Sequence, residues 1–244
     1  TSTVITQFRL SGVPFRMRRR KLWALASLPF LARLCGPALT ATAVARRVVL
    51  WDIDGTLVES TDLAWTSTNQ VLARNGFPAV SEAEYREATR FTTPARLAFH
   101  AKTDPDHSIG LELAKQFDEE YVALVSPSSV PLFPGLQTLL QELVAKEVCL
   151  GALSNACGAY VRAVLAAHSL SSHFKCQLGA DDVDEAKPNP GGLLRCCRLL
   201  GADPSECVYV GDSLGDGLAA SAAGLRSVGV RWGAGKGLEA AFDE

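Results

Sequence analysis

No stretch of this 244-residue sequence approaches the ~20 consecutive apolar residues that a membrane-spanning helix needs, so we predict no stable membrane span. Cysteine pairs of the form C-x-x-C are also absent, and the seven cysteines are odd in number. Several of them fall in apolar runs, which indicates reduced and mostly buried thiols in a reducing compartment. A zinc site and a disulfide framework are therefore not expected.

Acidic residues are missing from residues 1–51, which contain nine basic residues. Subtracting these nine from the 24 basic residues of the chain leaves 15 basic and 26 acidic residues in 52–244, a balance of −11. An acidic folded part argues against a nucleic-acid surface. The 48% of hydrophobic residues is ordinary for a globular protein and is enough for a sizeable core.

Methionine occurs once, at Met17, and the first residue is Thr1. Residues 1–47 are rich in Arg, Ser, Thr and Ala, which is typical of a leader that directs a protein to a mitochondrion or plastid. A disordered extension is the other interpretation of this segment, and we hypothesise that translation begins at Met17. A secretory signal is an alternative, although Pro29 and Arg33 interrupt its apolar run. Without a functional leader the protein would be cytoplasmic.

The stretch from Val48 to Ser60 reads V-V-L-W-D-I-D-G-T-L-V-E-S. Its apolar start predicts a buried strand of a parallel sheet. Asp52 and Asp54 would then lie at the carboxyl end of the strand, where open α/β sheets bind their ligands. Two carboxylates so close together are unfavourable unless a cation or a reaction uses them. The alternative is a surface strand that ends in an acidic turn.

Residues 59–132 show helical patterns, and the segment is too long for a simple crossover between two strands. One helix is predicted from Ser60 or Thr61 to Gly76, and S-E-A-E is a capping box for a second over 81–90. Two more are predicted over 93–102 and 108–124. We therefore predict a small helical cap inserted after the first strand. Because arginine suits an anionic substrate, we expect four residues of the cap to contact the substrate: Arg90, Thr92, Thr93 and Arg96. The alternative is that these residues lie on a solvated helix face.

Strands and helices alternate after the cap, with strands predicted over 148–153, 176–178, 207–210 and 226–230. This order predicts an α/β fold with a doubly wound, Rossmann-like parallel sheet, formed by residues 48–58 and 133–244. Polar residues again follow the strands. Ser154 and Asn155 follow the second of the five predicted strands, and Asp212 and Asp216 follow the fourth. Lys187, which directly precedes Pro188, lies after the third strand.

In their joint order the motifs D-I-D-G-T, L-S-N, K-P and G-D-S-L-G-D resemble those of the haloacid dehalogenase superfamily of phosphatases. The resemblance covers about residues 46–233. The stretches D-G-T-L-V-E-S, K-P-N-P and V-Y-V-G-D-S are most similar to the phosphoglycolate phosphatase-like group, which carries a helical cap after the first motif.

The resemblance implies Mg²⁺-dependent hydrolysis of a small phosphorylated metabolite, a phosphate monoester such as 2-phosphoglycolate. Asp52 would be the nucleophile that forms an aspartyl-phosphate, and Asp54 would be the acid and then the base. The metal ligands would be Asp52, the backbone carbonyl of Asp54, and Asp212. Asp216 would orient Lys187 or a metal-bound water. The phosphoryl group would be held by Gly55, Thr56, Ser154, Asn155 and Lys187.

Two departures from the family pattern concern the periphery. Gly191 and Gly192 stand where an acidic residue often follows the K-P motif, which predicts a poorly capped helix. The sequence stops at Glu244, soon after the fifth predicted strand, so we expect a truncated carboxyl end and an open sheet edge.

Three functions are compatible with these motifs. Asp54 favours phosphoester chemistry, because the dehalogenase and phosphonatase branches of the superfamily depart at this position. A sugar phosphomutase is the alternative enzyme, and a non-catalytic binding protein of the same fold is a third possibility. The substrate and the oligomeric state are left open.

Overall fold

The computed structural model describes residues 47–103, 108–232 and 242–243. The predicted leader, with its hypothetical start at Met17, lies outside the described residues except for Arg47. In the described part of the chain no helix is both long and apolar enough to cross a bilayer.

The centre of the molecule is a parallel five-stranded sheet in the order β3-β2-β1-β4-β5. The strands are β1 (Val48–Trp51), β2 (Cys149–Leu153), β3 (Phe174–Leu178), β4 (Cys207–Gly211) and β5 (Arg226–Gly229). β3 begins two residues earlier than predicted. The sequence pattern placed its start at Cys176 because the polar residue Lys175 interrupts the apolar run, but Phe174 before it is buried and belongs to the strand. The predicted doubly wound α/β fold is confirmed by this topology.

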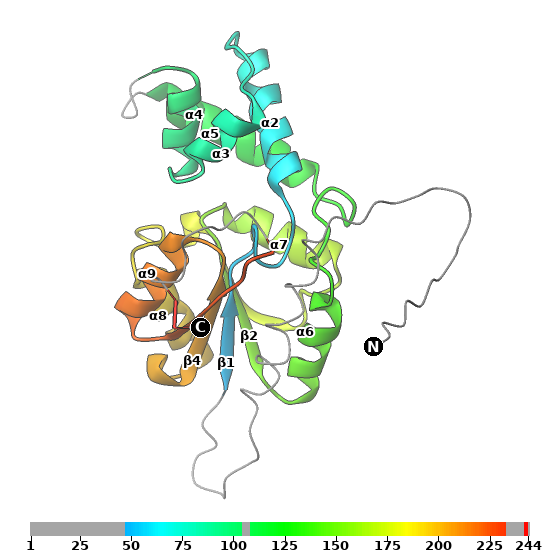
Figure 1. Ribbon diagram of the computed structural model, residues 1–244, viewed down its shortest axis with the longest axis vertical. Helices are drawn as coiled ribbons and strands as arrows, with labels where there is room; N and C mark the ends of the chain where they lie inside the picture. Colours follow the sequence, from blue (N-terminus) through cyan, green and yellow to red (C-terminus); the bar gives the residue numbers. More distant parts are fainter. Residues whose placement is uncertain (1–46, 104–107, 233–241, 244) are drawn as a thin grey trace, which may run out of the picture.

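Helices cover both faces of the sheet (Figure 1). The side chains of β1 alternate between the two faces and belong to two different apolar clusters. Val49 and Trp51 pack with α6 (Leu136–Ala145) and α7 (Gly158–Ala167). Val48 and Leu50 pack with α8 (Gly191–Leu200) and α9 (Leu214–Ala223). Two 3₁₀ turns complete this part, η2 (Ala180–Asp182) and η3 (Pro204–Glu206). β1 is therefore buried on both faces, as its uninterrupted apolar sequence predicts.

A second group of helices follows β1 in the sequence and lies beyond the carboxyl ends of the strands (Figure 1). It consists of α2 (Thr61–Arg74), α3 (Glu82–Ala88), α4 (Thr93–His100) and α5 (Ser108–Ala123). Ser81 forms the predicted capping box with Glu84. Ser60 is the N-cap residue of α2, but its side chain makes no capping hydrogen bond. The boundaries 59 and 132 for the cap stay a prediction.

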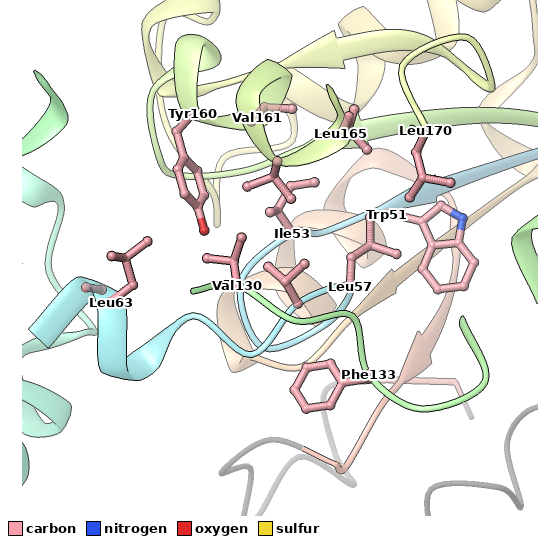
Figure 2. Close-up of a cluster of buried hydrophobic side chains, with 14 of the residues drawn as sticks. Trp51, Ile53, Leu57, Leu63, Val130, Phe133, Tyr160, Val161, Leu165 and Leu170 are labelled. Atoms are coloured by element: carbon pink, nitrogen blue, oxygen red, sulfur yellow. The ribbon is translucent and has the colours of Figure 1, made fainter. Parts of the chain in front are cut away.

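The turn after β1 is fixed by apolar anchors. Ile53, Leu57 and Val58 are fully buried, and the carbonyl group of Ile53 accepts hydrogen bonds from the N–H groups of residues 56–58. Figure 2 shows Ile53 and Leu57 within the apolar cluster, among side chains from α7 and from the segment around Val130. Because Ile53 points into the core, the residues on either side of it face the opposite way. Asp52 and Asp54 thus share one side of the turn.

The strand order reverses around β1, which has β2 on one side and β4 on the other. In doubly wound folds the ends of the strands at such a reversal form the ligand-binding crevice. Asp52 follows β1 and Asp212 follows β4, so both acidic residues lie at this point.

Candidate active site

A cleft of about 670 Å³ lies between the strand ends and the helices α2–α5. Residues from both parts of the chain line it. The sheet side contributes Asp52, Asp54, Gly55, Ser154, Asn155, Lys187 and Asp212. The helical side contributes Tyr85, Arg90, Thr92, Thr93, Arg96, Phe117 and Tyr121. Thr56 and Asp216, which were also predicted from the sequence, lie fully buried behind this lining.

Lys187 is the cation at the centre of the site. Its Nζ atom donates hydrogen bonds to Asp52 Oδ1 (2.8 Å) and Asp216 Oδ1 (2.7 Å), and its side chain is only 5% exposed. It also reaches the hydroxyl group of Tyr209 (2.7 Å) and the carbonyl group of Leu153 (3.2 Å). Burial alone would lower the pKa of Lys187, but the two carboxylates outweigh burial and hold the pKa above its ordinary value. Lys187 is therefore charged at neutral pH.

Asp216 is fixed by groups on both of its oxygens. Its Oδ2 atom accepts hydrogen bonds from the N–H group (3.0 Å) and the hydroxyl group (2.6 Å) of Ser213, in a capping box at the start of α9. Burial acts to raise the pKa of Asp216, but Lys187 and Ser213 outweigh it, so the pKa lies below its ordinary value. The geometry thus places Asp216 on Lys187, which is one of the two roles predicted for it.

Gly55 and Thr56 set the position of Asp212. Gly55 has a φ of +76°, and a Cβ atom there would overlap the Asp212 carboxylate, so only glycine fits this turn. The Thr56 hydroxyl group donates to Asp212 Oδ1 at 3.1 Å. Thr56 is placed to orient Asp212 and does not itself reach the cleft.

The carboxylates at the strand ends repel one another. Burial, and then the charge of Asp216, raises the pKa of Asp52 well above its ordinary value despite the nearby Lys187. The same two causes raise the pKa of Asp212 to about 7. Oxygen atoms of Asp52, Asp212 and Asp216 lie within 4.8 Å of one another, so this cluster could hold a metal ion. Because Lys187, Tyr209 and Ser213 already bind Asp216, Asp52 and Asp212 are the available carboxylate ligands.

The two residues after β2 have different surroundings. The Ser154 hydroxyl group donates to Asp54 Oδ2 (3.3 Å) and accepts from the N–H group of Ala156 (3.0 Å). The Asn155 amide is paired with the backbone of Lys187 through two hydrogen bonds of 2.9 Å. Both polar atoms of the Asn155 side chain are used there, so its side chain positions Lys187. The second hydrogen of its Nδ2 atom and its backbone N–H group are left for the phosphate contact predicted from the sequence.

Asp54 is surrounded by hydroxyl groups. Its Oδ1 atom accepts hydrogen bonds from Ser60 (2.6 Å), Tyr160 (2.7 Å) and Tyr121 (3.0 Å). Figure 2 shows the Tyr160 side chain at the edge of the apolar cluster, with its hydroxyl oxygen pointing between Leu63 and Val130. Ser60 therefore uses its side chain on Asp54, which explains why α2 lacks the expected side-chain cap.

The predicted cap contacts line the cleft but differ in burial. Arg90 is exposed, lies 4.6 Å from the Phe91 ring, and donates to the carbonyl group of Glu87. Thr93 begins α4, after Thr92. Arg96 is only 9% exposed and lies over the rings of Tyr85 (5.2 Å) and Phe117 (4.9 Å).

The Arg96 guanidinium group is buried without a hydrogen-bonded anion in the described part of the chain. Its Nε and Nη2 atoms are buried without a hydrogen-bond partner there, and no ion pair joins it to a described carboxylate. Asp118 is the nearby carboxyl group: burial and Asp181 raise its pKa to about 6, and the charge of Arg96 acts to lower it, but no hydrogen bond joins the two side chains. An unpaired buried guanidinium group is unfavourable unless a ligand supplies the anion.

Four residues of the site were not predicted from the sequence: Ser60 as a contact of Asp54, and Tyr121, Tyr160 and Tyr209. A buried tyrosine needs a partner for its hydroxyl group, so the tyrosine within the apolar strand V-Y-V-G was a usable signal for Tyr209. No local pattern marks Tyr121 and Tyr160, because their meeting depends on how α5 and α7 pack.

Comparison with known proteins decides the family. Residues 49–230 match the model of the haloacid dehalogenase-like hydrolase family. The chain belongs to this family. The family predicted from the four motifs is thus confirmed, and the strand ends that carry those motifs all lie inside the matched range.

Several relatives of this haloacid dehalogenase-like hydrolase are phosphatases. Phosphoglycolate phosphatase of Xanthomonas campestris pv. campestris strain 8004 is 32% identical over 187 residues, which are 77% of this chain and 84% of the relative. Phosphoglycolate phosphatase of Xylella fastidiosa strain 9a5c is 33% identical over 187 residues, which are 77% of this chain and 81% of the relative. The family match and these relatives confirm the predicted enzyme class: the chain is a hydrolase of the haloacid dehalogenase-like family, and its relatives include phosphatases.

The fold is likewise similar to a solved structure. The crystal structure of CbbY from Rhodobacter sphaeroides in complex with phosphate has a TM-score of 0.71 and 26% sequence identity. The match covers 81% of this chain and 92% of that one.

The burial of Asp212 and its repulsion by Asp216 predict how the stability of the metal-free protein depends on pH. The pKa of Asp212 is about 7 in the folded state against an ordinary value of 3.8, so the folded state binds more protons between these values. The free energy of unfolding should therefore fall as the pH rises from about 4 to 7. Asp212→Asn removes this loss, and the variant should be more stable than the wild type at pH 8 by up to about 4 kcal/mol.

Urea unfolding in the presence of a chelator, at pH 5 and at pH 8, measures this difference. Asp62→Asn removes an exposed carboxylate in the first turn of α2 and serves as the matched control, because its stability should change between the two pH values by the same amount as that of the wild type. A stability difference for Asp212→Asn that is the same at both pH values would contradict the raised pKa of Asp212.

Proposed function

We propose that this hydrolase cleaves a small phosphate monoester through a phosphorylated Asp52. The observation that carries the proposal is the contact of Lys187 with Asp52. A buried ammonium group lies 2.8 Å from a carboxylate oxygen that faces the cleft, so a nucleophile and a group that binds phosphoryl oxygens are side by side. Phosphoryl transfer needs this combination of positioning and positive charge.

The residues divide the chemistry as follows. Asp52 attacks phosphorus, and a bond from its carboxylate oxygen to phosphorus forms as the bond to the ester oxygen breaks. Protonated Asp54 gives its proton to the departing ester oxygen, which leaves as an alcohol. Asp54 then takes a proton from a water molecule that attacks phosphorus, and this step releases phosphate and restores the Asp52 carboxylate. Lys187 and Ser154 hold the phosphoryl oxygens throughout.

We further propose Mg²⁺ as the cofactor, held by Asp52, Asp212 and the backbone carbonyl group of Asp54. The donor set fits the ion, since Mg²⁺ prefers carboxylate and other hard oxygen ligands. The raised pKa values of Asp52 and Asp212 point the same way, because they reflect buried negative charge that Lys187 alone does not offset. A bound Mg²⁺ would supply this positive charge and bring two anions, the carboxylate and the phosphate ester, together.

The class of substrate follows from Arg96. This guanidinium group lies on the helical side of the cleft, opposite the carboxylates of the sheet side, and lacks an anionic partner among the described residues. We propose that it binds a second anionic group of the substrate, at the end away from the ester. A small ester with a carboxylate satisfies this condition, and 2-phosphoglycolate is our first candidate, in agreement with the names of the relatives.

Phosphate release should depend on Mg²⁺ and on Asp52. In a panel of small phosphate monoesters, we expect release with Mg²⁺ and a loss of at least about 100-fold with a chelator, because the carboxylates then repel the substrate. Asp52→Asn should abolish turnover, since the amide is a poor nucleophile.

Chromatography of the organic product distinguishes hydrolysis from the alternative phosphomutase reaction. An isomerised sugar phosphate without release of inorganic phosphate would contradict the hydrolase. Phosphate release that survives in Asp52→Asn would contradict the assigned nucleophile, and a protein inactive on the whole panel would favour a binding role.

The second anion site should be visible in substrate preference. Arg96→Met keeps much of the side-chain volume but removes the charge, so kcat/KM for 2-phosphoglycolate should fall about 10- to 100-fold. For an uncharged ester such as ethyl phosphate, kcat/KM should change less than about 3-fold, because no charged contact is lost.

Arg74→Met is the matched control. Arg74 pairs with Glu120 on the helical part and does not contribute to the lining of the cleft. The control should leave both substrates unaffected. Equal losses on the two esters in Arg96→Met would contradict the second anion site.

A further inference from the structure

Two tyrosines join the helical part to the sheet part of the molecule. Tyr121 belongs to α5 and Tyr160 to α7. Their rings are stacked, with centroids 4.1 Å apart and planes inclined by 15°, and Tyr121 donates a hydrogen bond to the Tyr160 hydroxyl oxygen at 2.9 Å. Both side chains are buried.

Both hydroxyl groups meet the same atom, Asp54 Oδ1. The distances are 2.7 Å from Tyr160 and 3.0 Å from Tyr121, and Ser60 adds a third hydroxyl group at 2.6 Å. Tyr121 has a single hydroxyl hydrogen, which it shares between the Tyr160 hydroxyl oxygen and Asp54 Oδ1. A carboxylate oxygen has about two lone-pair directions, so Ser60, Tyr160 and this shared hydrogen together occupy Oδ1. A tyrosine hydroxyl group carries its hydrogen at neutral pH, so both tyrosines are donors to this oxygen.

The other oxygen of Asp54 is left for chemistry. Oδ2 accepts one hydrogen bond among the described residues, from the Ser154 hydroxyl group at 3.3 Å. Ser154 lines the cleft at the end of β2, where the proposed phosphoryl site lies. The hydroxyl groups therefore make the two oxygens of one carboxyl group different, one held and one facing the substrate.

We infer that Tyr121 and Tyr160 are positioning residues that hold Asp54 Oδ1, so that Oδ2 carries the proton to the departing ester oxygen. This inference rests on the proposed function, in which Asp54 is the acid. The proton passes from Oδ2 to the ester oxygen as the phosphorus–oxygen bond breaks, and the electron pair of that bond stays on the alcohol. The hydroxyl groups of the tyrosines keep their own protons.

Because Tyr121 comes from the helical part, the acid is held fully only when α5 lies against α7. Tyr121 is 67 residues away from Asp54 in the sequence, so this contact depends on the packing of α5 against α7.

Tyr121→Phe and Tyr160→Phe test the inference with two esters. Leaving-group release in the first turnover, measured by rapid quench with enzyme in excess, isolates the step in which Asp54 gives its proton. For an alkyl phosphate that the wild type hydrolyses, the rate should fall about 10- to 100-fold in each variant, because an alkoxide needs a proton to depart. For 4-nitrophenyl phosphate the loss should be less than about 3-fold, because nitrophenolate departs without one. The concentration of ester that gives half the maximal rate should not change for either substrate.

The ratio of the rate for the alkyl phosphate to the rate for 4-nitrophenyl phosphate distinguishes an effect on Asp54 from partial unfolding of the variant. A variant that is partly unfolded loses both rates by the same factor, so only a change in the ratio reports on Asp54. Thr68→Val removes another buried hydroxyl group of the helical part, one that donates to the carbonyl group of Ala64, and should leave the ratio unchanged.

Equal losses on the two esters, or an unchanged alkyl phosphate rate, would overturn the inference and leave the proposed function standing. A wild-type protein that releases no leaving group from either ester would overturn the proposed function and, with it, the inference.

Discussion

The contact of one buried ammonium group with two buried carboxylates is the constraint on which the site depends. Lys187 binds Asp52 and Asp216 at once, and Asp212 lies close enough to belong to the same cluster. Three carboxylates against one cation are unfavourable in a buried place, which is why the pKa values of Asp52 and Asp212 are raised. The core tolerates this arrangement because β1 and β4 are held by apolar packing on both faces. The stored repulsion is a reason for the site to bind positive charge.

The helical part contributes two further groups to the site at the strand ends. Arg96 brings an unpaired positive charge to the cleft, and Tyr121 brings a hydroxyl group to Asp54. The sheet part thus supplies the reacting groups, while the helical part supplies charge for the far end of a substrate and a hold on the acid. A family that varies its helical insertion can change the substrate in this way without changing the strand-end chemistry.

The sequence predicted most of the fold and the strand-end residues, because those signals are local. Apolar runs followed by Asp52 and Asp212 mark buried strands and their carboxyl ends, and parallel strands bring such ends together. The contacts of Asn155 with the backbone of Lys187, and of Tyr160 with Asp54, could not be predicted in this way. Each joins segments more than 30 residues apart, and it depends on loop geometry and helix packing that no short pattern encodes. The same holds for Ser60, whose hydroxyl group has two possible partners and in the structure binds Asp54.

The central claim is that Asp52 becomes phosphorylated. The direct measurement is to mix the protein with Mg²⁺ and a hydrolysed phosphate monoester, quench in acid within the first turnovers, and locate the phosphoryl group by peptide mass spectrometry. Cleavage after Arg47 and Arg74 isolates the segment that contains Asp52, and fragmentation separates Asp52 from Asp54 and Ser60. The account predicts one phosphoryl group on the Asp52 carboxylate. A phosphoryl group on any other residue, or none while phosphate is being released, would contradict it.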